Sequence, residues 1–424
     1  MRCPAPSGKS FATCFTLLVL CPIVLLAQSP DSGTDEDEPV PREPLGPYGL
    51  CWESAPSMDY GGRSVASIQG MASGLIGRKV DKPAVAPAWD FPLAIGMLLV
   101  QHEVMGHGGR AREFSLDPSY GLGFDFSAYT TIDQSPESNE QNILLAAGGT
   151  EATGVLSRRL LLDVYAPGGG QGAVIPLLMM TKLDLPLYVI QTEEPEPGSD
   201  FLEQFESGND MTIYLVSRQG LRAGANPVDV WERSYVIDFN DPLLERNFDE
   251  LRLTALWNLL DPAVIMAVVD YFDRHIRGEQ RVRPRTWQVA PRVGLTAGTR
   301  GALGIGELSR FLDVYAVTDW GVGNIYVRDL DSSVDRSWGG GIGFHRVPLG
   351  SRITLGAQGD WWDDPRSLER AEPDSGWHVG AEVDWMIQRN WGLTTKVGSK
   401  SEGFLPGTPS EKGTYAGFGV LFAF

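Results

Sequence analysis

The chain has 424 residues, of which 42% are hydrophobic and 21% are charged, so it is long enough to bury more than one domain core. Its formal net charge of -19 argues against a nucleic-acid partner, because phosphate binding needs a basic face that this balance does not supply. The acidity is partly local, since residues 31–38 are mostly aspartate and glutamate.

Residues 1–27 have the features of a secretory signal peptide. A basic start is followed by a long apolar run, and the small Ala27 stands before a suitable cleavage point. A lipoprotein signal at Cys21 is the alternative, but Leu20 is bulky where such signals have a small residue. Residues 28–47 are rich in Pro, Asp, Glu, Ser and Gly, which predicts a disordered lead-in.

The cysteines indicate an exported protein without disulfides. Three of the four cysteines fall within the predicted signal peptide, so the mature chain keeps only Cys51. An intramolecular disulfide and a cysteine-based zinc site are then both excluded. An exported chain of this kind suits a bacterial envelope better than a eukaryotic secretory route.

Residues 48–280 are predicted to be rich in helix. Residues 92–107 have helix length, few β-branched residues and a Gly-Gly stop directly after them, which predicts a buried helix. A second helix is predicted over residues 142–165, where Glu151 lies in the middle of a face of Gly and Ala. A last helix is predicted from about residue 242 to 277.

The pattern changes after a basic, Pro-containing linker at residues 281–285. Between residues 286 and 424, about eight segments of about ten residues alternate between an aliphatic or aromatic face and a face of glycine or charge, as in a small membrane barrel. A soluble sandwich also alternates in this way. The terminal Phe422 and Phe424 resemble the C-terminal signature of bacterial outer-membrane barrels, and the tryptophans are numerous enough for interfacial girdles.

The expected fold is therefore α+β and multidomain: an α-helical domain followed by an antiparallel, roughly eight-stranded β-barrel. The charged residues on the inward face of this barrel are expected to pair with one another and not to form a catalytic site; they are Arg292, Asp360, Glu382, Asp384 and Lys396.

The motif that indicates catalytic chemistry is His-Glu-Val-Met-Gly-His at residues 102–107. In the common zinc-protease helix the two histidines are four residues apart, whereas here they are five residues apart. On an ideal α-helix this spacing separates the two rings by about 140°, which prevents them from binding one ion. A one-residue π-bulge restores their alignment, and Gly106 is the residue that makes such a distortion inexpensive.

The pattern His-Glu-x-x-Gly-His resembles the motif of the dipeptidyl peptidase III family of zinc peptidases, over six residues only. The resemblance implies that His102 and His107 are zinc ligands and that Glu103 is the general base. Size, signal peptide and β half do not match that cytosolic family, so its fold and specificity are not carried over. The chemistry agrees with these roles, because catalytic zinc keeps one position for water and an adjacent carboxylate accepts its proton.

A third protein ligand is required, and Glu151 is expected to supply it. A helix with a flat Gly/Ala face can pack on the motif helix and present one carboxylate to it. This resembles the glutamate-zincin arrangement, in which the third ligand comes from a downstream helix. Weaker candidates are Glu140, Asp117, Asp125 and His275.

These features together predict a zinc-dependent peptide-bond hydrolase of the bacterial cell envelope, acting on a peptide or protein substrate. Its zincin-like domain, residues 48–280, is expected to face the periplasm, tethered to an outer-membrane barrel at residues 286–424 in contact with lipid. An intramembrane metalloprotease is one alternative, but the helical segments lack a run of about twenty uninterrupted apolar residues. A non-enzymatic barrel with a helical metal- or partner-binding domain is the other.

Overall fold

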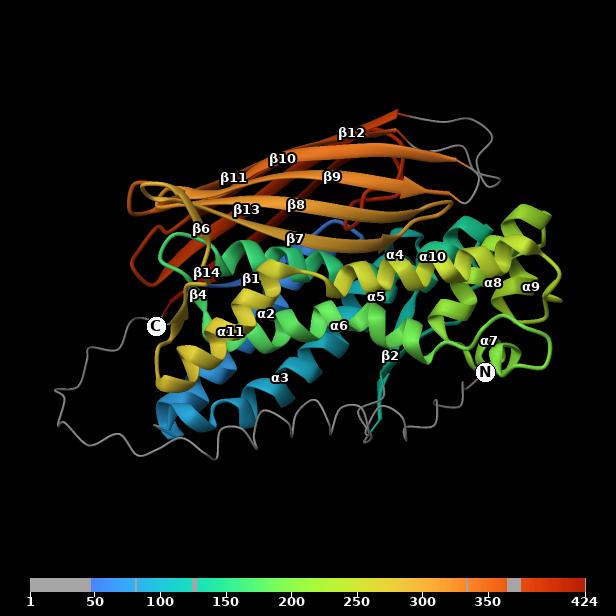
Figure 1. Cartoon of the computed structure of the whole chain (residues 1–424), viewed down its shortest axis with the longest axis horizontal. Coiled ribbons are helices and arrows are strands. Elements are labelled where there is room, and N and C mark those ends of the chain that lie inside the picture. Colours follow the sequence, from blue (N-terminus) through green and yellow to red (C-terminus); the bar gives the residue numbers. More distant parts are fainter. Residues whose placement is uncertain (1–46, 81, 124–127, 333–334, 364–374, 424) are drawn as a thin grey trace.

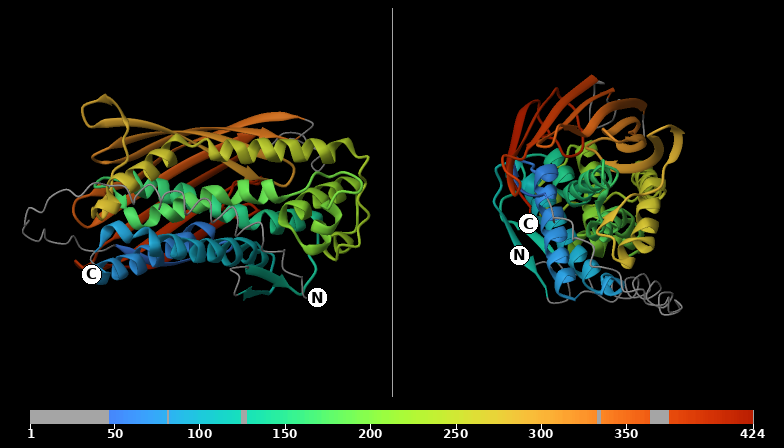
Figure 2. Two further views of the ribbon diagram at one scale, coloured as in Figure 1. Left: turned by 60° about the horizontal axis from the view of Figure 1, so that its bottom comes forward. Right: turned by 90° about the vertical axis from the view of Figure 1, so that its left-hand side faces the viewer.

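The computed structural model describes residues 47–80, 82–123, 128–332, 335–363 and 375–423. The predicted signal peptide, most of the lead-in, Asp125 and Phe424 lie outside these residues. Figure 1 shows one large sheet with helices packed along its inner face, and Figure 2 shows the same two layers from other directions.

Ten strands form one antiparallel sheet in the order β1-β14-β13-β12-β11-β10-β9-β8-β7-β6. Its edges are the short strands β1 (Tyr48–Glu53) and β6 (Trp287–Ala290). The eight long strands correspond to the alternating segments of the sequence: β7 (Val293–Leu303), β8 (Leu308–Thr318), β9 (Gly321–Asp331), β10 (Arg336–Leu349), β11 (Ile353–Asp363), β12 (Ser375–Trp385), β13 (Trp391–Lys400) and β14 (Gly413–Phe422).

The alternation places apolar side chains outside and polar side chains inside. On β12, for example, Trp377, Val379 and Val383 are exposed, whereas His378 and Asp384 are buried against the helices. The two faces of the sheet are therefore reversed relative to those of an ordinary sheet that packs on a hydrophobic core.

The α+β class is confirmed, but the predicted barrel is wrong, because the sheet is not closed. Its first edge is covered by α2 (Met58–Val80). The backbone N–H groups of Gly49 and Cys51 on β1 donate to the hydroxyls of Ser67 and Ser64, each at 2.8 Å. Helix side chains thus accept the hydrogen bonds that a closing strand would otherwise accept.

The opposite edge is covered in the same way at β7, by α6 (Ile175–Gln191) and α10 (Pro242–Leu259). The N–H of Gly301 donates to Asn258 Oδ1 at 3.3 Å, and Lys182 Nζ donates to the carbonyl of Thr299 at 2.5 Å. The sheet is therefore not closed into a barrel, but backbone groups of β1 and β7 that have no strand partner bond to helix side chains. Alternation alone does not reveal this, because it carries no information on which groups meet the first and last strands.

The remaining elements of the helical layer surround α5 (Asn139–Val164), which runs along the inner face of the sheet and is buried over most of its length. They are α3 (Pro87–Leu99), η2 (Val100–His107), α4 (Gly108–Glu113), the hairpin of β2 (Pro118–Leu122) and β3 (Ala128–Ile132), α7 (Phe201–Ser207), α8 (Asp210–Ala223), α9 (Pro227–Trp231) and α11 (Pro262–Asp273). The short strands β4 (Gly170–Gln171) and β5 (Arg281–Val282) pair with each other.

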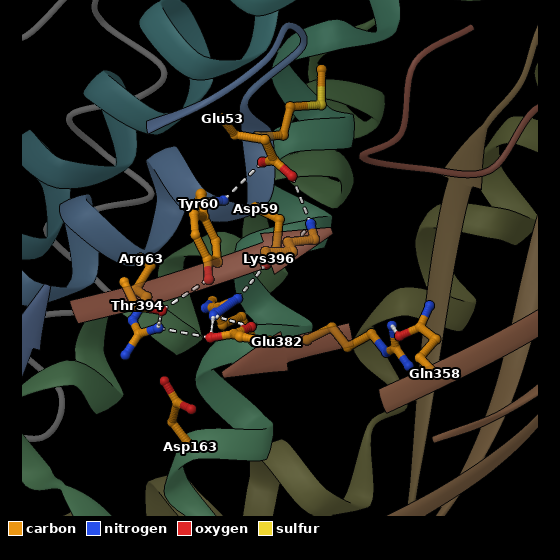
Figure 3. Close-up of polar contacts among 12 residues, drawn as sticks. Glu53, Asp59, Tyr60, Arg63, Asp163, Gln358, Glu382, Thr394 and Lys396 are labelled. Carbon is orange, nitrogen blue, oxygen red and sulfur yellow. Dashed lines mark hydrogen bonds and ion pairs between the residues drawn. The ribbon is translucent and has the colours of Figure 1, made fainter. Parts of the chain in front are cut away.

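A network of ion pairs fills the interior between α2, α5 and the sheet (Figure 3). Arg63 contacts Glu382 and Asp384 at 2.7 Å, and Lys396 contacts Glu53 at 2.7 Å and Asp59 at 2.8 Å. Three of the expected inward charges therefore form ion pairs, but with residues of α2 and β1 and not with one another. Arg292 instead lies exposed near a strand end.

The predicted π distortion of the motif helix is confirmed. Residues Val100–His107 form a π-helix, η2, between α3 and α4. Gly106 lies against α5 so closely that a Cβ on it would be 2.6 Å from both the carbonyl oxygen of Gly148 and the Cα of Gly149. The two backbones therefore touch at a point where a side chain on Gly106 does not fit.

We predict that Gly106→Ala lowers the free energy of unfolding by at least about 2 kcal/mol, because the added methyl meets rigid backbone. Gly96→Ala is the matched control, since a Cβ on Gly96 in α3 meets no atom within 4 Å. This control is expected to stabilise the helix by roughly 0.5–1 kcal/mol. Urea unfolding followed by circular dichroism measures both changes, and equal effects would contradict the close approach.

Candidate metal centre

The π-helical turn brings the two motif histidines together. Their Nε2 atoms lie 3.1 Å apart, and their ring centroids are 4.9 Å apart. The backbone N–H of Gly108 donates to the carbonyl of Glu103, five residues earlier, which is the hydrogen bond of the wider turn. The five-residue spacing therefore places His102 and His107 on one side of the helix.

A third group joins them from α8. Asp210 Oδ2 lies 3.3 Å from His102 Nε2 and 3.2 Å from His107 Nε2. Asn209 caps this helix, accepting from the N–H groups of Met211 and Thr212, and so fixes the turn that carries Asp210. The ligand atoms of His102, His107 and Asp210 all lie within 4.8 Å of one another, and this cluster can hold a metal ion.

Hydrogen bonds on the far side of each ring orient the two imidazoles. His102 Nδ1 lies 2.9 Å from Asp184 Oδ2, which also accepts from Thr153 Oγ1 at 2.8 Å. His107 Nδ1 donates to the carbonyl of Leu145 at 2.6 Å. With both Nδ1 atoms donating, the lone pairs of both Nε2 atoms point at the shared space beside Asp210.

The buried carboxylates make this space attractive to a cation. Burial lowers the pKa of both imidazoles, but Asp184 beside His102 and Asp210 beside His107 outweigh it, so both pKa values are raised. Burial likewise opposes ionisation of Asp210, but the two histidines lower its pKa. Tyr188 stacks on His102 with ring centroids 5.0 Å apart and closes one side of the site.

Glu103 lies next to the cluster and is held in place by the hairpin. Its side chain is buried, and its Oε2 accepts from Thr130 Oγ1 of β3 at 2.8 Å. The same hydroxyl is 3.1 Å from the backbone carbonyl of Glu103. The carboxylate thus has one fixed hydrogen-bond donor and directly follows a ligand-bearing residue.

The structure does not bring Glu151, the predicted third ligand, to the cluster, where Asp210 is the third group instead. Glu151 forms a fully buried ion pair with Arg110 and accepts from the N–H of Gly407 at 2.8 Å. Gly149 is the position of α5 that faces the ring of His102. Residue 151 lies about 200° further around the helix and so points away from the metal centre.

Sequence reasoning missed Asp210 because it lies more than one hundred residues after the motif, at the end of a polar segment. The usable signal was Asn209-Asp210 directly before an amphipathic run, which is typical of a helix start. Among the weaker candidates, Glu140 and Asp117 are not part of the cluster, and His275 pairs with Asp90 instead.

A cavity lies on the other side of α5, between that helix and the sheet. Its lining includes Glu151, Arg158, His345 and Glu382, but none of the three cluster residues.

No protein-family model, curated protein or solved structure matches this chain. The resemblance to the dipeptidyl peptidase III motif therefore remains a resemblance of six residues. The functional argument rests on the geometry of the cluster and on the carboxylate beside it.

We predict that Asp210→Asn weakens metal binding at least about 100-fold, because loss of even an outer hydrogen-bond partner costs 10–100-fold. Glu151→Gln should keep the metal but lower the free energy of unfolding by about 3 kcal/mol, since Arg110 loses one buried counter-charge. Metal content by mass spectrometry and thermal unfolding separate the two effects. Metal loss in Glu151→Gln alone would restore the sequence-based assignment.

Proposed function

We propose that the protein is a zinc-dependent peptide-bond hydrolase, with His102, His107 and Asp210 as the zinc ligands. The observation that carries this proposal is the triangle formed by their ligand atoms, with sides of 3.1, 3.2 and 3.3 Å. Tetrahedral zinc with bonds of about 2.0–2.1 Å has ligands about 3.3–3.4 Å apart, so the triangle matches one face of such a site.

The number of ligands favours catalysis over storage. Structural zinc sites are closed by four protein ligands, whereas catalytic sites use three and leave a position for water. Within the described parts of the chain, no fourth His, Cys, Asp or Glu belongs to the cluster. The mixed set of two imidazoles and one carboxylate is typical of zinc hydrolases.

Glu103 is the proposed general base. Zinc, when bound, polarises the scissile carbonyl and makes a bound water acidic. With zinc bound, Glu103 would accept a proton from the attacking water and would donate it to the amide nitrogen as the C–N bond breaks. Thr130 holds the carboxylate in orientation through its hydroxyl at 2.8 Å.

We predict that Glu103→Gln retains zinc and loses at least about 100-fold in peptide hydrolysis, because it keeps the shape and removes the base. Glu203→Gln, an exposed acid on α7, is the control and should retain full activity. Zinc content and cleavage of a fluorogenic peptide library are the measurements. Zinc binding without any peptidase activity in the wild type would favour the non-enzymatic alternative.

We further propose that the outer face of the sheet lies against membrane lipid. One rim of this face carries Trp361 and Trp377, which are paired in register, and the other carries Trp385 and Trp391. Trp377 and Trp385 are eight residues apart on β12, which is about 27 Å along the strand. This spacing is close to the apolar band of about 25 Å in membrane barrels.

The positions between the two rims support the same placement. The outward side chains of β12 there are Val379, Ala381 and Val383, and the neighbouring strands expose Ile325, Val327, Ile342, Phe344, Val397, Phe418 and Val420. A water-facing sheet of this size rarely exposes so large a contiguous apolar patch.

The apolar surface continues onto the helices that cover the β7 edge. Leu253, Leu256 and Leu259 of α10 and Ile265 and Val269 of α11 are all exposed. Pro242–Leu259 and Pro262–Arg277, which are bent by 43° at their junction, are together long and apolar enough to span a membrane. The helical segment Gly172–Gln191 is also long and apolar enough, but 72% of its most apolar stretch is buried inside the protein. Backbone groups of β1 and of β7 that have no strand partner are thus hydrogen-bonded to helix side chains, as a lipid environment requires.

We predict that Val383→Arg, at an outward position between the rims, destabilises the vesicle-inserted protein by about 2–4 kcal/mol. Ser375→Arg, at the exposed strand end beyond Trp377, is the matched control and should cost at most about 1 kcal/mol. Urea unfolding from lipid vesicles measures the difference. A neutral Val383→Arg would show that this face lies in water.

A further inference from the structure

We propose that the metal centre opens on the external side of the outer membrane, so that its substrates are proteins or peptides outside the cell. This inference rests on the membrane placement proposed above and adds its direction. The sequence alone predicted that the helical domain faces the periplasm, on the assumption that it is separate from the strands.

The first step is to locate the metal centre relative to the strands. Gly149 of α5 faces His102, and Glu151, two residues later, binds the backbone of Gly407 in the connection between β13 and β14. Arg110, at the end of the motif helix, also donates to the carbonyl of Thr408 in that connection, at 3.2 Å. The metal centre therefore lies at the end of the sheet where β13 ends and β14 begins.

The rest of α5 runs towards the opposite end. Arg158 donates to Gln358 in the middle of β11 at 2.9 Å, and Asp163, near the end of α5, pairs with Arg346 close to the turn between β10 and β11. Figures 1 and 2 show this helix lying lengthwise beneath the strands. The two ends of the sheet can thus be called the metal end and the far end.

The second step compares the strand connections. At the metal end, the connections are residues 304–307, 332–335, 364–374 and 401–412, which are four, four, eleven and twelve residues long. At the far end they are residues 319–320, 350–352 and 386–390, which are two, three and five residues long. The two longest connections, of eleven and twelve residues, are both at the metal end.

The chain also enters and leaves the sheet at the far end. Tyr48, the first residue of β1, pairs with Phe422, the last residue of β14, and Phe422 pairs with Trp391 at the start of β13. In outer-membrane β-barrels, short turns face the periplasm and long loops face outwards. By this rule the far end is periplasmic and the metal end is external.

The third step is the polarity of the metal end, which suits water beyond the lipid. Helix α10 exposes charged residues in its first half and leucines only from Leu253 onwards. Beside it, Arg310 pairs with Glu250 at 3.0 Å and with Asp329 at 3.1 Å, at the strand ends of this rim. A polar rim of this kind suits the placement of a hydrolytic site outside the lipid.

Single-cysteine labelling of the full chain tests the direction. Among the described residues only Cys51 is a cysteine, and it is buried, so the wild type supplies the background. Glu402→Cys places a thiol in the β13–β14 connection, and Ser351→Cys places one in the turn between β10 and β11. In intact bacterial cells, a membrane-impermeant maleimide should label Glu402→Cys, and it should label Ser351→Cys only after the outer membrane is permeabilised.

The reverse labelling pattern would overturn the proposed direction while leaving membrane insertion intact. Recovery of the protein in the soluble fraction would overturn the membrane placement itself. An impermeant fluorogenic peptide added to intact cells provides a second readout, with Glu103→Gln as the inactive control. Cleavage seen only after permeabilisation would contradict the external direction but support the peptidase, so the two failures are distinguishable.

Discussion

The structure depends on one backbone contact, the approach of the π-helical turn to α5 at Gly106. Because Gly106 and Gly148 have no side chains, the two helices touch directly, and Gly149 leaves space for the ring of His102. The same central helix supports α6 and α8, which supply Asp184 and Asp210. A single close contact thus sets the positions of both imidazoles and, through the neighbouring helices, of the carboxylates around them.

The helices pack on one another through hydrophobic cores, whereas the layer between the helices and the sheet is rich in ion pairs and the outward face of the sheet is apolar. Buried charges are stable only when paired, and here cations from the helices meet acids from the strands, as Arg63 does with Asp384. Helices with inward polar groups can therefore replace the strands of a barrel. Ser64 and Ser67 on one edge and Asn258 on the other complete the hydrogen bonds of the sheet.

Much of the site could be predicted because it is local. The two histidines, the glutamate and the glycine lie within six residues, and helix geometry alone shows that a five-residue spacing requires a wider turn. The third ligand could not be predicted in this way. Glu151 and Asp210 are both acids on helices downstream of the motif, and the sequence does not specify which helix face meets the histidines.

The sequence by itself determined the alternation of the strands, the polar inward face and the π-helical motif, because each depends on neighbours within a few residues. Only the tertiary structure decided that the sheet remains open, that Asp210 meets the imidazoles while Glu151 pairs with Arg110, and that this pair binds the β13–β14 connection. These outcomes depend on contacts between residues far apart in the chain. The rotation and the packing direction of α5 settle them, and periodicity specifies neither.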